Sequence, residues 1–329
     1  MAKILLTYCV PTEPVLRQVP RKTASWCLHE FSLAHSGEAV DAWVVYDNLL
    51  EPETISIDRR RTMLVTGEPP SVRRYRSGFT SQFGFVRTSH EAILHPNVVR
   101  GHEAQPWHYG MHPCQSHSQV LDYDTLASFT PPAKTKLLSV IASNKVVTDD
   151  HRQRLRFVEQ LKSAFGDQID VFGRGIRDMP DKADAIWNYK YHIAMENDHS
   201  EHYMSEKLPD CFLGWSFPFY SGGMYADCVF PKKCFARIDM YDPVRSIETI
   251  RAHIQSSSYE TNLEWIGKAR TLVLDELNLF AVLCKAYDSM NSRVPELHLR
   301  KATTTTLLPK KKSVRLSLRR LMQAIALVG

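Results

Sequence analysis

The 329-residue sequence has no apolar run that approaches the roughly 20 residues needed to cross a bilayer. Its first ten residues are too short an apolar stretch for a signal peptide and lead directly into Pro11, so we expect a β-strand there. Both absences favour a cytoplasmic protein. Hydrophobic residues make up 43% of the chain and charged residues 23%, which excludes a disordered or fibrous protein. The length suits two domains of ordinary size.

The sequence also lacks the paired cysteines of a disulfide-stapled or zinc-binding protein. Its seven cysteines are odd in number and scattered, and several of them, such as Cys211 and Cys284, lie in apolar runs. This pattern is typical of buried free thiols in a reducing compartment. We therefore expect neither a disulfide framework nor a structural zinc site.

Acidic residues are missing from residue 310 onward. Six Lys and Arg residues lie there, one more than the net charge of +5, so residues 1–309 have a net charge of −1. A body without excess positive charge argues against a nucleic-acid-binding surface. Leu318, Leu321, Met322 and Ile325 recur at helical spacing, as in a helix that lies on an anionic membrane. A helix packed on the protein body or on a partner is the alternative. The basic residues are Lys310, Lys311, Lys312, Arg315, Arg319 and Arg320.

Strand-like and helix-like segments alternate along the rest of the chain. This alternation predicts an α/β protein with two Rossmann-like domains that face each other across a cleft. Pro131-Pro132 marks the predicted boundary between an N-terminal domain (1–130) and a second domain (131–300), followed by a linker and the basic amphipathic tail (301–329). We expect strands at 3–10, 42–46, 62–66, 83–86, 136–142, 169–172, 216–220 and 235–239, and helices at 26–35, 150–165, 244–256 and 265–290.

The segment from Tyr189 to Lys207 is the most informative stretch. An aromatic-rich strand ends at Glu196-Asn197, and after a polar loop Ser205 is placed to cap a new helix. A helix start is a natural site for an anion, Lys207 adds a positive charge there, and Glu206 can accept hydrogen bonds from sugar hydroxyls. The pattern favours a sugar-nucleotide site. An ordinary strand–loop–helix with a solvated Glu-Lys pair is the alternative.

This segment resembles the signature of the α1,3/α1,4-fucosyltransferases, glycosyltransferase family 10, which reads Tyr-Lys-Phe-x-x-x-Phe-Glu-Asn, a loop, and then Tyr-x-Thr-Glu-Lys. The chain departs from it at Met195 and Ser205, where the family has Phe and Thr. The resemblance covers residues 134–245 well and the N-terminal half only in patches. The matching residues are Tyr189, Lys190, Glu196, Asn197, Tyr203, Glu206 and Lys207.

The resemblance implies a GT-B fold with the nucleotide bound by the C-terminal domain. It also implies that Glu206 holds the ribose, that Lys207 contacts the diphosphate, and that Asn197 and Tyr203 line the donor site. Ser143-Asn144 falls after a predicted strand, where ligands of open α/β sheets bind.

Arg154 is the first candidate for binding the diphosphate. The segment Ser-Asn…Arg-x-x-Phe resembles the phosphate-contacting stretch of the family, and matching its Phe to Phe157 selects Arg154. Arg152 and Arg156 are close rivals. Arginine suits this role because its planar guanidinium contacts phosphate oxygens in a bidentate manner.

Glu68 is the candidate catalytic base. It follows an apolar strand in Val-Thr-Gly-Glu-Pro-Pro, and the family has a comparable Glu at the equivalent place, to which the base role is assigned. An ordinary turn carboxylate is the alternative. Arg73, Arg74 and Arg76 follow closely and could contact an acidic acceptor or the donor phosphate, or form a solvated basic loop.

Two other patterns resemble metal sites. Asp122-Tyr123-Asp124 matches the Asp-x-Asp of metal-dependent glycosyltransferases, but it lies far in sequence from the nucleotide elements. The group His108, His112, Cys114 and His117 fits no standard zinc spacing. Gly173-x-Gly175 alone does not identify a phosphate loop. We therefore expect no metal site and no cofactor.

The resulting hypothesis is an inverting, metal-independent fucosyltransferase that transfers fucose from GDP-fucose to a glycan acceptor. The expected acceptor is a GlcNAc-containing surface polysaccharide or lipopolysaccharide, reached from the inner face of the membrane with peripheral contact through residues 310–329. A GT-B enzyme with another nucleotide sugar, or an inactive carbohydrate-binding relative, is the alternative.

Overall fold

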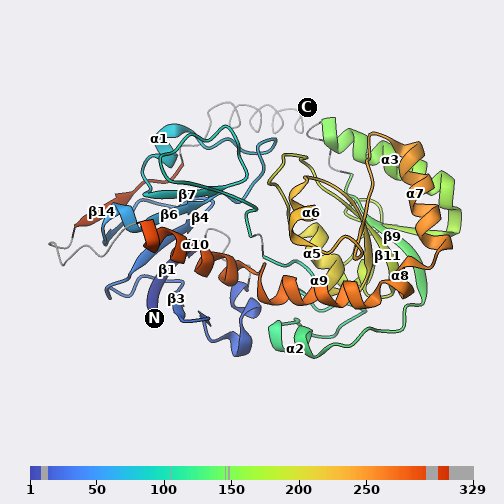
Figure 1. Cartoon of the computed structure of the whole chain (residues 1–329), viewed down its shortest axis with the longest axis horizontal. Coiled ribbons are helices and arrows are strands. Elements are labelled where there is room, and N and C mark those ends of the chain that lie inside the picture. Colours follow the sequence, from blue (N-terminus) through green and yellow to red (C-terminus); the bar gives the residue numbers. More distant parts are fainter. Residues whose placement is uncertain (9–13, 105, 145, 147–148, 294–302, 311–329) are drawn as a thin grey trace, which may run out of the picture.

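The computed structural model describes residues 1–8, 14–104, 106–144, 146, 149–293 and 303–310. These residues form two α/β domains that lie side by side (Figure 1). Each domain is built on a mainly parallel sheet, with seven described strands in the first and five in the second. The predicted fold class is confirmed. No helix within the described residues has the length and apolar character needed to cross a membrane.

The first domain has the strand order β2-β3-β1-β4-β6-β7-β8, and only β2 runs antiparallel to its neighbour. Alternate residues of the central strand β1 face opposite sides of the sheet, as a pleated strand requires, with Ile4 in one apolar core and Leu5 in the other. The strands are β1 (Ala2–Tyr8), β2 (Ser25–Trp26), β3 (His29–Ser32), β4 (Ala42–Tyr46), β6 (Thr62–Val65), β7 (Phe85–Thr88) and β8 (Val98–Arg100), with helix α1 (Ser77–Thr80) and 3-10 turns at Val15–Gln18, Pro20–Lys22 and Arg59–Arg61.

The second domain has the strand order β10-β9-β11-β12-β13, all parallel. Its core combines the sheet with the buried face of the helix predicted at 150–165, on which Phe157, Val158 and Leu161 lie. The strands are β9 (Lys136–Ile141), β10 (Ile169–Phe172), β11 (Tyr189–Met195), β12 (Phe217–Ser221) and β13 (Ala236–Arg237). The helices are α2 (Tyr123–Ser128), α3 (Asp149–Phe165), α4 (Ala183–Ile186), α5 (Lys207–Leu213), α6 (Tyr225–Val229), α7 (Pro243–Gln255), α8 (Ser258–Thr261) and α9 (Leu263–Asp275), and Gly166–Gln168 is a 3-10 turn.

The helix predicted at residues 26–35 is wrong. Strands β2 and β3 form a tight hairpin there, and Cys27 in its turn has a φ of 51°. Strand β3 then pairs in parallel with β1, which buries Phe31 in the core while Leu28 stays exposed. Sheet pairing and burial therefore override a weak local helical preference.

The long helix predicted at residues 265–290 is two helices. Helix α9 ends at Asp275, and α10 (Leu279–Arg293) begins after Asn278, whose Oδ1 accepts a hydrogen bond from the Ala281 N–H. The two helices follow each other along one side of the molecule (Figure 1). Helix α10 packs in the core of the first sheet, so the chain returns to the first domain before the predicted end of the second at residue 300.

The predicted linker at residues 302–309 is also wrong where the structure describes it. Strand β14 (Thr304–Leu307) pairs antiparallel with β5 (Glu53–Ser56) of the first domain, and Leu307 is fully buried. The threonine run forms a strand because its β-branched side chains suit a pleated edge. Of the predicted basic tail, Lys310 belongs to this folded segment, and residues 311–329 lie outside the described residues.

Candidate active site

The carboxyl edge of the second sheet contains a topological switch point. In the order β10-β9-β11-β12-β13 the connections from β9 and β11 diverge, and ligands of such open sheets bind in the crevice between the two strand ends. Ser143 and Asn144 follow β9, and Asn197 follows β11. The structure therefore places three predicted donor-site residues at the edge where a ligand is expected.

A glycine loop after β10 lies against the same strand ends. Gly173 has a φ of +134°, and a Cβ there would lie 2.1 Å from the Ala142 carbonyl oxygen, so only glycine fits. The next turn is held by the Asn144 N–H, which donates to the Arg174 carbonyl oxygen at 3.2 Å. The motif Gly173-x-Gly175 thus brings two loops together at the switch point, beside Asn144.

Arg154 reaches this switch point from α3. It shares the buried helix face with Phe157, so its guanidinium points to the strand ends and is only 6% exposed. Nη1 donates to Asn197 Oδ1 at 2.8 Å and Nη2 to the Ser143 carbonyl oxygen at 3.3 Å, whereas Nε has no described partner. Burial lowers the pKa of Arg154. The exposed rivals Arg152 and Arg156 point elsewhere, which supports the choice of Arg154.

Glu196 anchors the start of α5. Its Oε1 accepts a hydrogen bond from the Ser205 N–H at 2.8 Å, and Oε2 lies 3.1 Å from Lys207 Nζ. Ser205 Oγ accepts from the Lys207 N–H at 3.3 Å, but the N-cap residue of α5 is Glu206, one residue later than the predicted cap. Burial opposes the charge on Lys207, but Glu196 and Glu206 outweigh burial and raise its pKa. Lys207 is therefore a fixed cation at a helix start, and Glu196, to which sequence reasoning gave no separate role, is the residue that positions it.

A second buried ion cluster surrounds Glu206. Lys182 Nζ lies 2.7 Å from Glu206 Oε1 and 2.8 Å from Asp210 Oδ2, and His108 Nδ1 lies 3.4 Å from Glu206 Oε1. Burial alone would raise the pKa of Glu206, but Lys182 and Lys207 outweigh burial and hold the pKa well below its usual range. Glu206 is thus an ionised carboxylate in a fixed position, able to accept from sugar hydroxyls. No sequence pattern singles out Lys182.

Tyr203 lies buried between the two domains, with 3% of its surface exposed. Burial raises its pKa well above the ordinary value, and four carboxyl groups add to the shift, two from the second domain (Glu196, Glu206) and two from the first (Glu103, Glu68). Tyr203 is therefore a neutral hydrogen-bonding group where the carboxylates of both domains converge.

Glu68 follows β6 in a loop whose backbone is held from two sides. The hydroxyl of Tyr75 accepts from the Gly67 and Glu68 N–H groups at 3.1 and 3.4 Å and donates to Asp47 Oδ1. His90 Nε2 lies 2.7 Å from the Glu68 carbonyl oxygen. The Glu68 side chain itself is half-buried. The backbone of the loop is thus held in place, and Glu68 keeps part of its surface exposed.

The Glu68 loop contacts the donor side directly. The Ser71 N–H donates to Asp198 Oδ2 at 2.9 Å, and Ser71 Oγ donates to the Asn197 carbonyl oxygen at 3.3 Å. Asn197 in turn bonds Arg154. Two short steps therefore connect the candidate base loop with the candidate phosphate site, although the two are 86 residues apart in sequence between Glu68 and Arg154.

A second carboxyl, which sequence reasoning missed, lies in the first domain near Tyr203. Glu103 is fully buried, its Oε1 accepts from the Ser89 N–H at 3.3 Å and from the Ser89 hydroxyl, and its Oε2 has no described partner. Burial raises its pKa to about 8. The neighbouring His102 ring packs 5.4 Å from that of Tyr225 in the second domain. Glu103 has no motif around it that could have revealed it.

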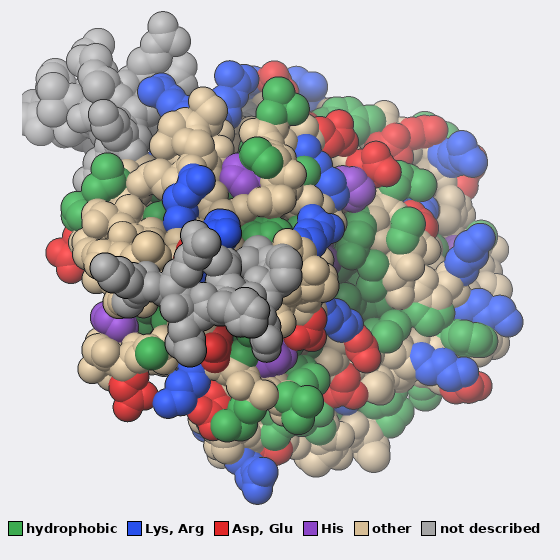
Figure 2. Space-filling model, turned by 60° about the vertical axis from the view of Figure 1, so that its left-hand side comes forward, with side chains coloured by type: hydrophobic (Ala, Val, Ile, Leu, Met, Phe, Trp, Pro, Cys, Tyr) green, Lys and Arg blue, Asp and Glu red, His purple; other side chains and the backbone are tan. Residues whose placement is uncertain are grey.

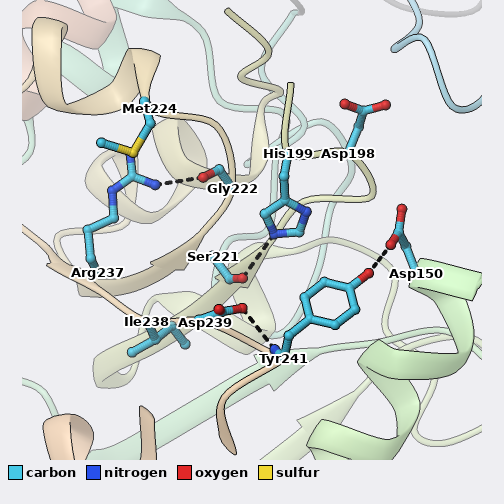
Figure 3. Close-up of a pocket in the computed structure, with 10 residues that line it drawn as sticks. All are labelled: Asp150, Asp198, His199, Ser221, Gly222, Met224, Arg237, Ile238, Asp239 and Tyr241. Atoms are coloured by element: carbon cyan, nitrogen blue, oxygen red, sulfur yellow. Dashed lines mark hydrogen bonds between the residues drawn. The ribbon is translucent and has the colours of Figure 1, made fainter. Parts of the chain in front are cut away.

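A cavity of about 570 Å³ opens beside the switch point, at the carboxyl ends of β11, β12 and β13 (Figure 3). Its walls carry three carboxylates, one guanidinium and two aromatic rings, those of His199 and Tyr241, with centroids 5.9 Å apart. The Tyr241 hydroxyl bonds Asp150 and His199 Nε2 lies 3.2 Å from Ser221 Oγ. Such polar walls with ring faces suit a sugar. The lining residues are Asp150, Asp198, His199, Ser221, Gly222, Met224, Arg237, Ile238, Asp239 and Tyr241.

The residues of the two metal-like patterns have other partners. Asp122 Oδ1 caps α2 by accepting from the Thr125 N–H at 3.0 Å, and Asp124 Oδ2 accepts from the Arg21 N–H at 2.6 Å. His117 packs with its ring centroid 4.7 Å from that of Trp187, away from the His108–Glu206 contact. Among the described residues no group of three His, Cys, Asp or Glu side chains is close enough to hold a metal ion.

Two α/β domains built on mainly parallel sheets are the architecture of the GT-B class of glycosyltransferases. A family model described as glycosyltransferase family 10 (fucosyltransferase), C-terminal part, matches residues 131–303, slightly more than half of the chain. The chain belongs to glycosyltransferase family 10, the fucosyltransferases. The predicted family and enzyme class are therefore confirmed.

The chain is also similar to solved structures. One is described as α1,3-fucosyltransferase, with 16% identity, 80% of each chain covered and a TM-score of 0.48. Another is α1,3-fucosyltransferase with GDP-fucose, with 14% identity, 83% of this chain and 90% of that chain covered and a TM-score of 0.46. A glycosyltransferase from Rickettsia africae ESF-5 has 10% identity, 89% and 98% coverage and a TM-score of 0.44. Curated protein sequences give no match.

Proposed function

We propose that this protein transfers fucose from GDP-fucose to a hydroxyl of a glycan acceptor, with inversion at the anomeric carbon. In this reaction a base removes the proton of the acceptor hydroxyl, and the acceptor oxygen bonds to the anomeric carbon. The bond from that carbon to the diphosphate breaks, and GDP leaves with the electron pair. The site must therefore supply a base, positive charge near the leaving group and contacts that align the two substrates.

The observation that carries the proposal is the Arg154–Asn197–Ser143 cluster at the switch point. Arg154 is buried and charged, and its Nε has no partner among the described residues, so a diphosphate oxygen that approaches this guanidinium would gain a charge-assisted hydrogen bond. Lys207 supplies a second cation at the start of α5. In this proposal these side chains stabilise the departing GDP, and no divalent ion takes part.

The remaining parts of the donor have places near this cluster. Glu206 accepts hydrogen bonds from the ribose hydroxyls, and Tyr203 and Asn144 line the donor site. We assign the fucosyl group to the cavity at the ends of β11–β13, because its carboxylates can accept from sugar hydroxyls while the His199 and Tyr241 rings cover apolar sugar faces. The nearby Ser71–Asp198 contact then brings this sugar toward the first domain.

Glu68 is the proposed base, and the first domain is proposed to bind the acceptor. The Tyr75 hydroxyl and His90 hold the loop, so the carboxylate is positioned before the acceptor arrives. The proposed acceptor is a GlcNAc-containing polysaccharide or lipopolysaccharide on the cytoplasmic side of the membrane.

A panel of sugar nucleotides tests the donor. With GDP-fucose, GDP-mannose, UDP-galactose and UDP-GlcNAc at equal concentration, thermal unfolding should shift most with GDP-fucose, with and without EDTA. A ligand at 100 times its Kd stabilises the folded state by about 2.7 kcal/mol. A shift with a uridine sugar alone would identify another donor, binding without transfer to any glycan would identify an inactive relative, and loss of binding in EDTA would identify a metal.

Membrane contact through residues 311–329 is a separate proposal from the sequence. Five Lys and Arg residues remain there, and each is worth about 1 kcal/mol near an anionic surface. The full chain should sediment with vesicles that contain phosphatidylserine, less so as salt is raised, whereas a chain that ends at Lys310 should stay in solution. Equal sedimentation of the two chains would contradict the proposal.

A further inference from the structure

Hydrogen bonds hold the C-terminal segment against the first domain from Thr304 to Lys310. Strand β14 pairs with β5 from Thr304 to Leu307. Beyond it, the Leu308 N–H donates to Gln82 Oε1 at 2.8 Å, and the Lys310 N–H donates to Asn48 Oδ1 at 2.7 Å. Each residue fixed in this way costs conformational entropy, roughly 1–2 kcal/mol of backbone freedom. The contacts place one lysine at a defined point beside the Glu68 loop.

Lys310 reaches the ring that anchors the candidate base. Its Nζ lies 4.5 Å from the ring centroid of Tyr75, whose hydroxyl holds the Glu68 backbone. Burial, together with Arg73 and Arg76, lowers the pKa of Lys310 to about 8, and Glu68 partly opposes this shift. The three cations and the Glu68 carboxylate are therefore close enough to act on one another.

The positive charges of this group are incompletely matched. Arg73 pairs with Asp47, but within the described residues neither Arg76 nor Lys310 has a carboxylate in ion-pair contact. Gathering like charges on a partly buried ammonium costs free energy, which an anion bound among them would recover. Figure 2, in which the first domain comes forward, shows Lys and Arg side chains interspersed with Asp and Glu over the surface.

We propose that Arg73, Arg76 and Lys310 form an anion subsite beside Glu68, which binds a carboxylate, sulfate or phosphate group carried by the acceptor next to its reactive hydroxyl. The inference rests on the proposed function, because it takes the Glu68 side of the cleft as the acceptor side. It narrows the substrate class to acidic glycans.

The donor diphosphate is the competing anion, and the geometry favours the acceptor. The switch point has its own cations, Arg154 and Lys207, which hydrogen-bond residues of the second domain. Arg76 and Lys310 belong to the first domain, and Lys310 is held there by Asn48. Their charge therefore lies on the side of the cleft from which the hydroxyl is proposed to approach.

The test compares N-acetyllactosamine with its 3′-sulfated and 3′-sialylated forms, using the full chain saturated with GDP. Calorimetry should show tighter binding of both charged forms, by up to about 5-fold for each cation engaged, since part-exposed ion pairs are worth up to about 1 kcal/mol. Arg76→Ala and Lys310→Ala should each reduce the affinity for the charged forms, relative to the neutral form, by up to about 5-fold. Lys310→Arg should retain the preference, and the matched control Arg74→Ala, also exposed, should leave it unchanged. A preference for one charged form alone identifies sulfate or carboxylate as the group recognised.

Equal binding of charged and neutral disaccharides overturns the inference, as does failure of the sulfated and sialylated forms to bind. A weaker GDP affinity in Arg76→Ala and Lys310→Ala, with the acceptor preference intact, also overturns it and assigns the cations to the donor. Fucose transfer from GDP-fucose is measured on the same samples. Absence of transfer with an intact charge preference would count against the proposed function and not against the anion subsite.

Discussion

The carboxyl edges of the two sheets differ in how their charges are balanced. In the second domain Lys207 contacts Glu196, and Lys182 contacts Glu206 and Asp210, whereas Arg154 hydrogen-bonds only the uncharged groups of Asn197 and Ser143. In the first domain, Arg76 and Lys310 have no carboxylate in contact among the described residues. Both lysines of the second edge are thus held in ion pairs and only Arg154 lacks a carboxylate partner, whereas the first edge carries excess positive charge.

This difference indicates two kinds of recognition. A network of buried, paired charges holds Lys207 and Glu206 in one geometry, which suits a donor whose diphosphate and ribose are the same in every cycle. Excess charge on a half-buried surface instead selects the ligand that brings the missing negative group, and gives specificity more than rigidity. Pre-organisation is therefore expected on the donor side and selection on the acceptor side.

The largest effect is expected from Glu68→Gln, which removes the proposed base and keeps its shape. A positioned base contributes on the order of 10²–10⁴-fold, so kcat should fall by that factor while GDP-fucose affinity stays unchanged. Steady-state kinetics and calorimetry on the same variant measure the two quantities.

Glu51→Gln is the matched control, because Glu51 is an exposed carboxylate of the same domain. It should behave as the unmodified protein. If Glu68→Gln transfers fucose at a normal rate while Glu103→Gln does not, the buried second carboxyl takes the proton instead, and the acceptor side is centred on Glu103.

The next effect concerns the strand that brings Lys310 to the first domain. Leu307 is fully buried with Leu5, Trp43 and Val45, so Leu307→Ala should lower the free energy of unfolding by about 2–5 kcal/mol. Leu308→Ala is the control, since Leu308 is 51% exposed and its loss should change stability by no more than about 0.5 kcal/mol. Urea unfolding measures both. Equal stability of the two variants would mean that residues 304–307 form a linker and not a strand of the first domain. Lys310 would then have no fixed position beside Tyr75.

A smaller effect is expected at the switch point. Arg154→Ala should weaken GDP binding by about 10- to 150-fold, because a charge-assisted hydrogen bond is worth about 1.5–3 kcal/mol. Arg152→Ala and Arg156→Ala are controls on the exposed face of the same helix and should bind GDP normally. A loss in either control that matches the loss in Arg154→Ala would show that the helix contributes only a diffuse positive field.

The sequence predicts the second domain better than the first, for a physical reason. Arg154 lies on the same helical stripe as Phe157 and Val158, and Lys207 begins the helix that is expected after Ser205, so local periodicity and short-range motifs predict their places. The predicted second domain (131–300) and linker with tail (301–329) do not match the structure at their boundary. Helix α10 and strand β14 return to the first domain through contacts with strands that are distant in sequence.

Partners that are distant in sequence explain what was missed at the site. Lys182 meets Glu206 across 24 residues, and Lys310 meets the ring of Tyr75 across more than two hundred. The helix prediction at residues 26–35 is wrong for the same reason, because the pairing of β3 with β1 determines the conformation of this segment. Pairings of this kind have no short-range pattern, so the sequence predicts the chemistry of single residues but not the charge balance of the two edges.

The smallest effect tests whether Glu103 differs from the paired carboxylates of the donor side. Its pKa is about 8 in the folded protein because it is buried, against 4.5 for an ordinary Glu. Between these values the folded state holds a proton that the unfolded state lacks, so this contribution to stability is present at low pH and is lost as the pH rises toward 8. The slope is at most about 1.4 kcal/mol per pH unit. Glu103→Gln removes this contribution. The difference in urea-unfolding free energy between the unmodified protein and the variant should therefore change steadily from pH 6.5 to 8. The buried histidines His102 and His192 are present in both proteins, so their contribution cancels in this difference. Parallel stability profiles would mean that Glu103 is ionised in the folded protein and balanced by a cation, as Glu196 is by Lys207.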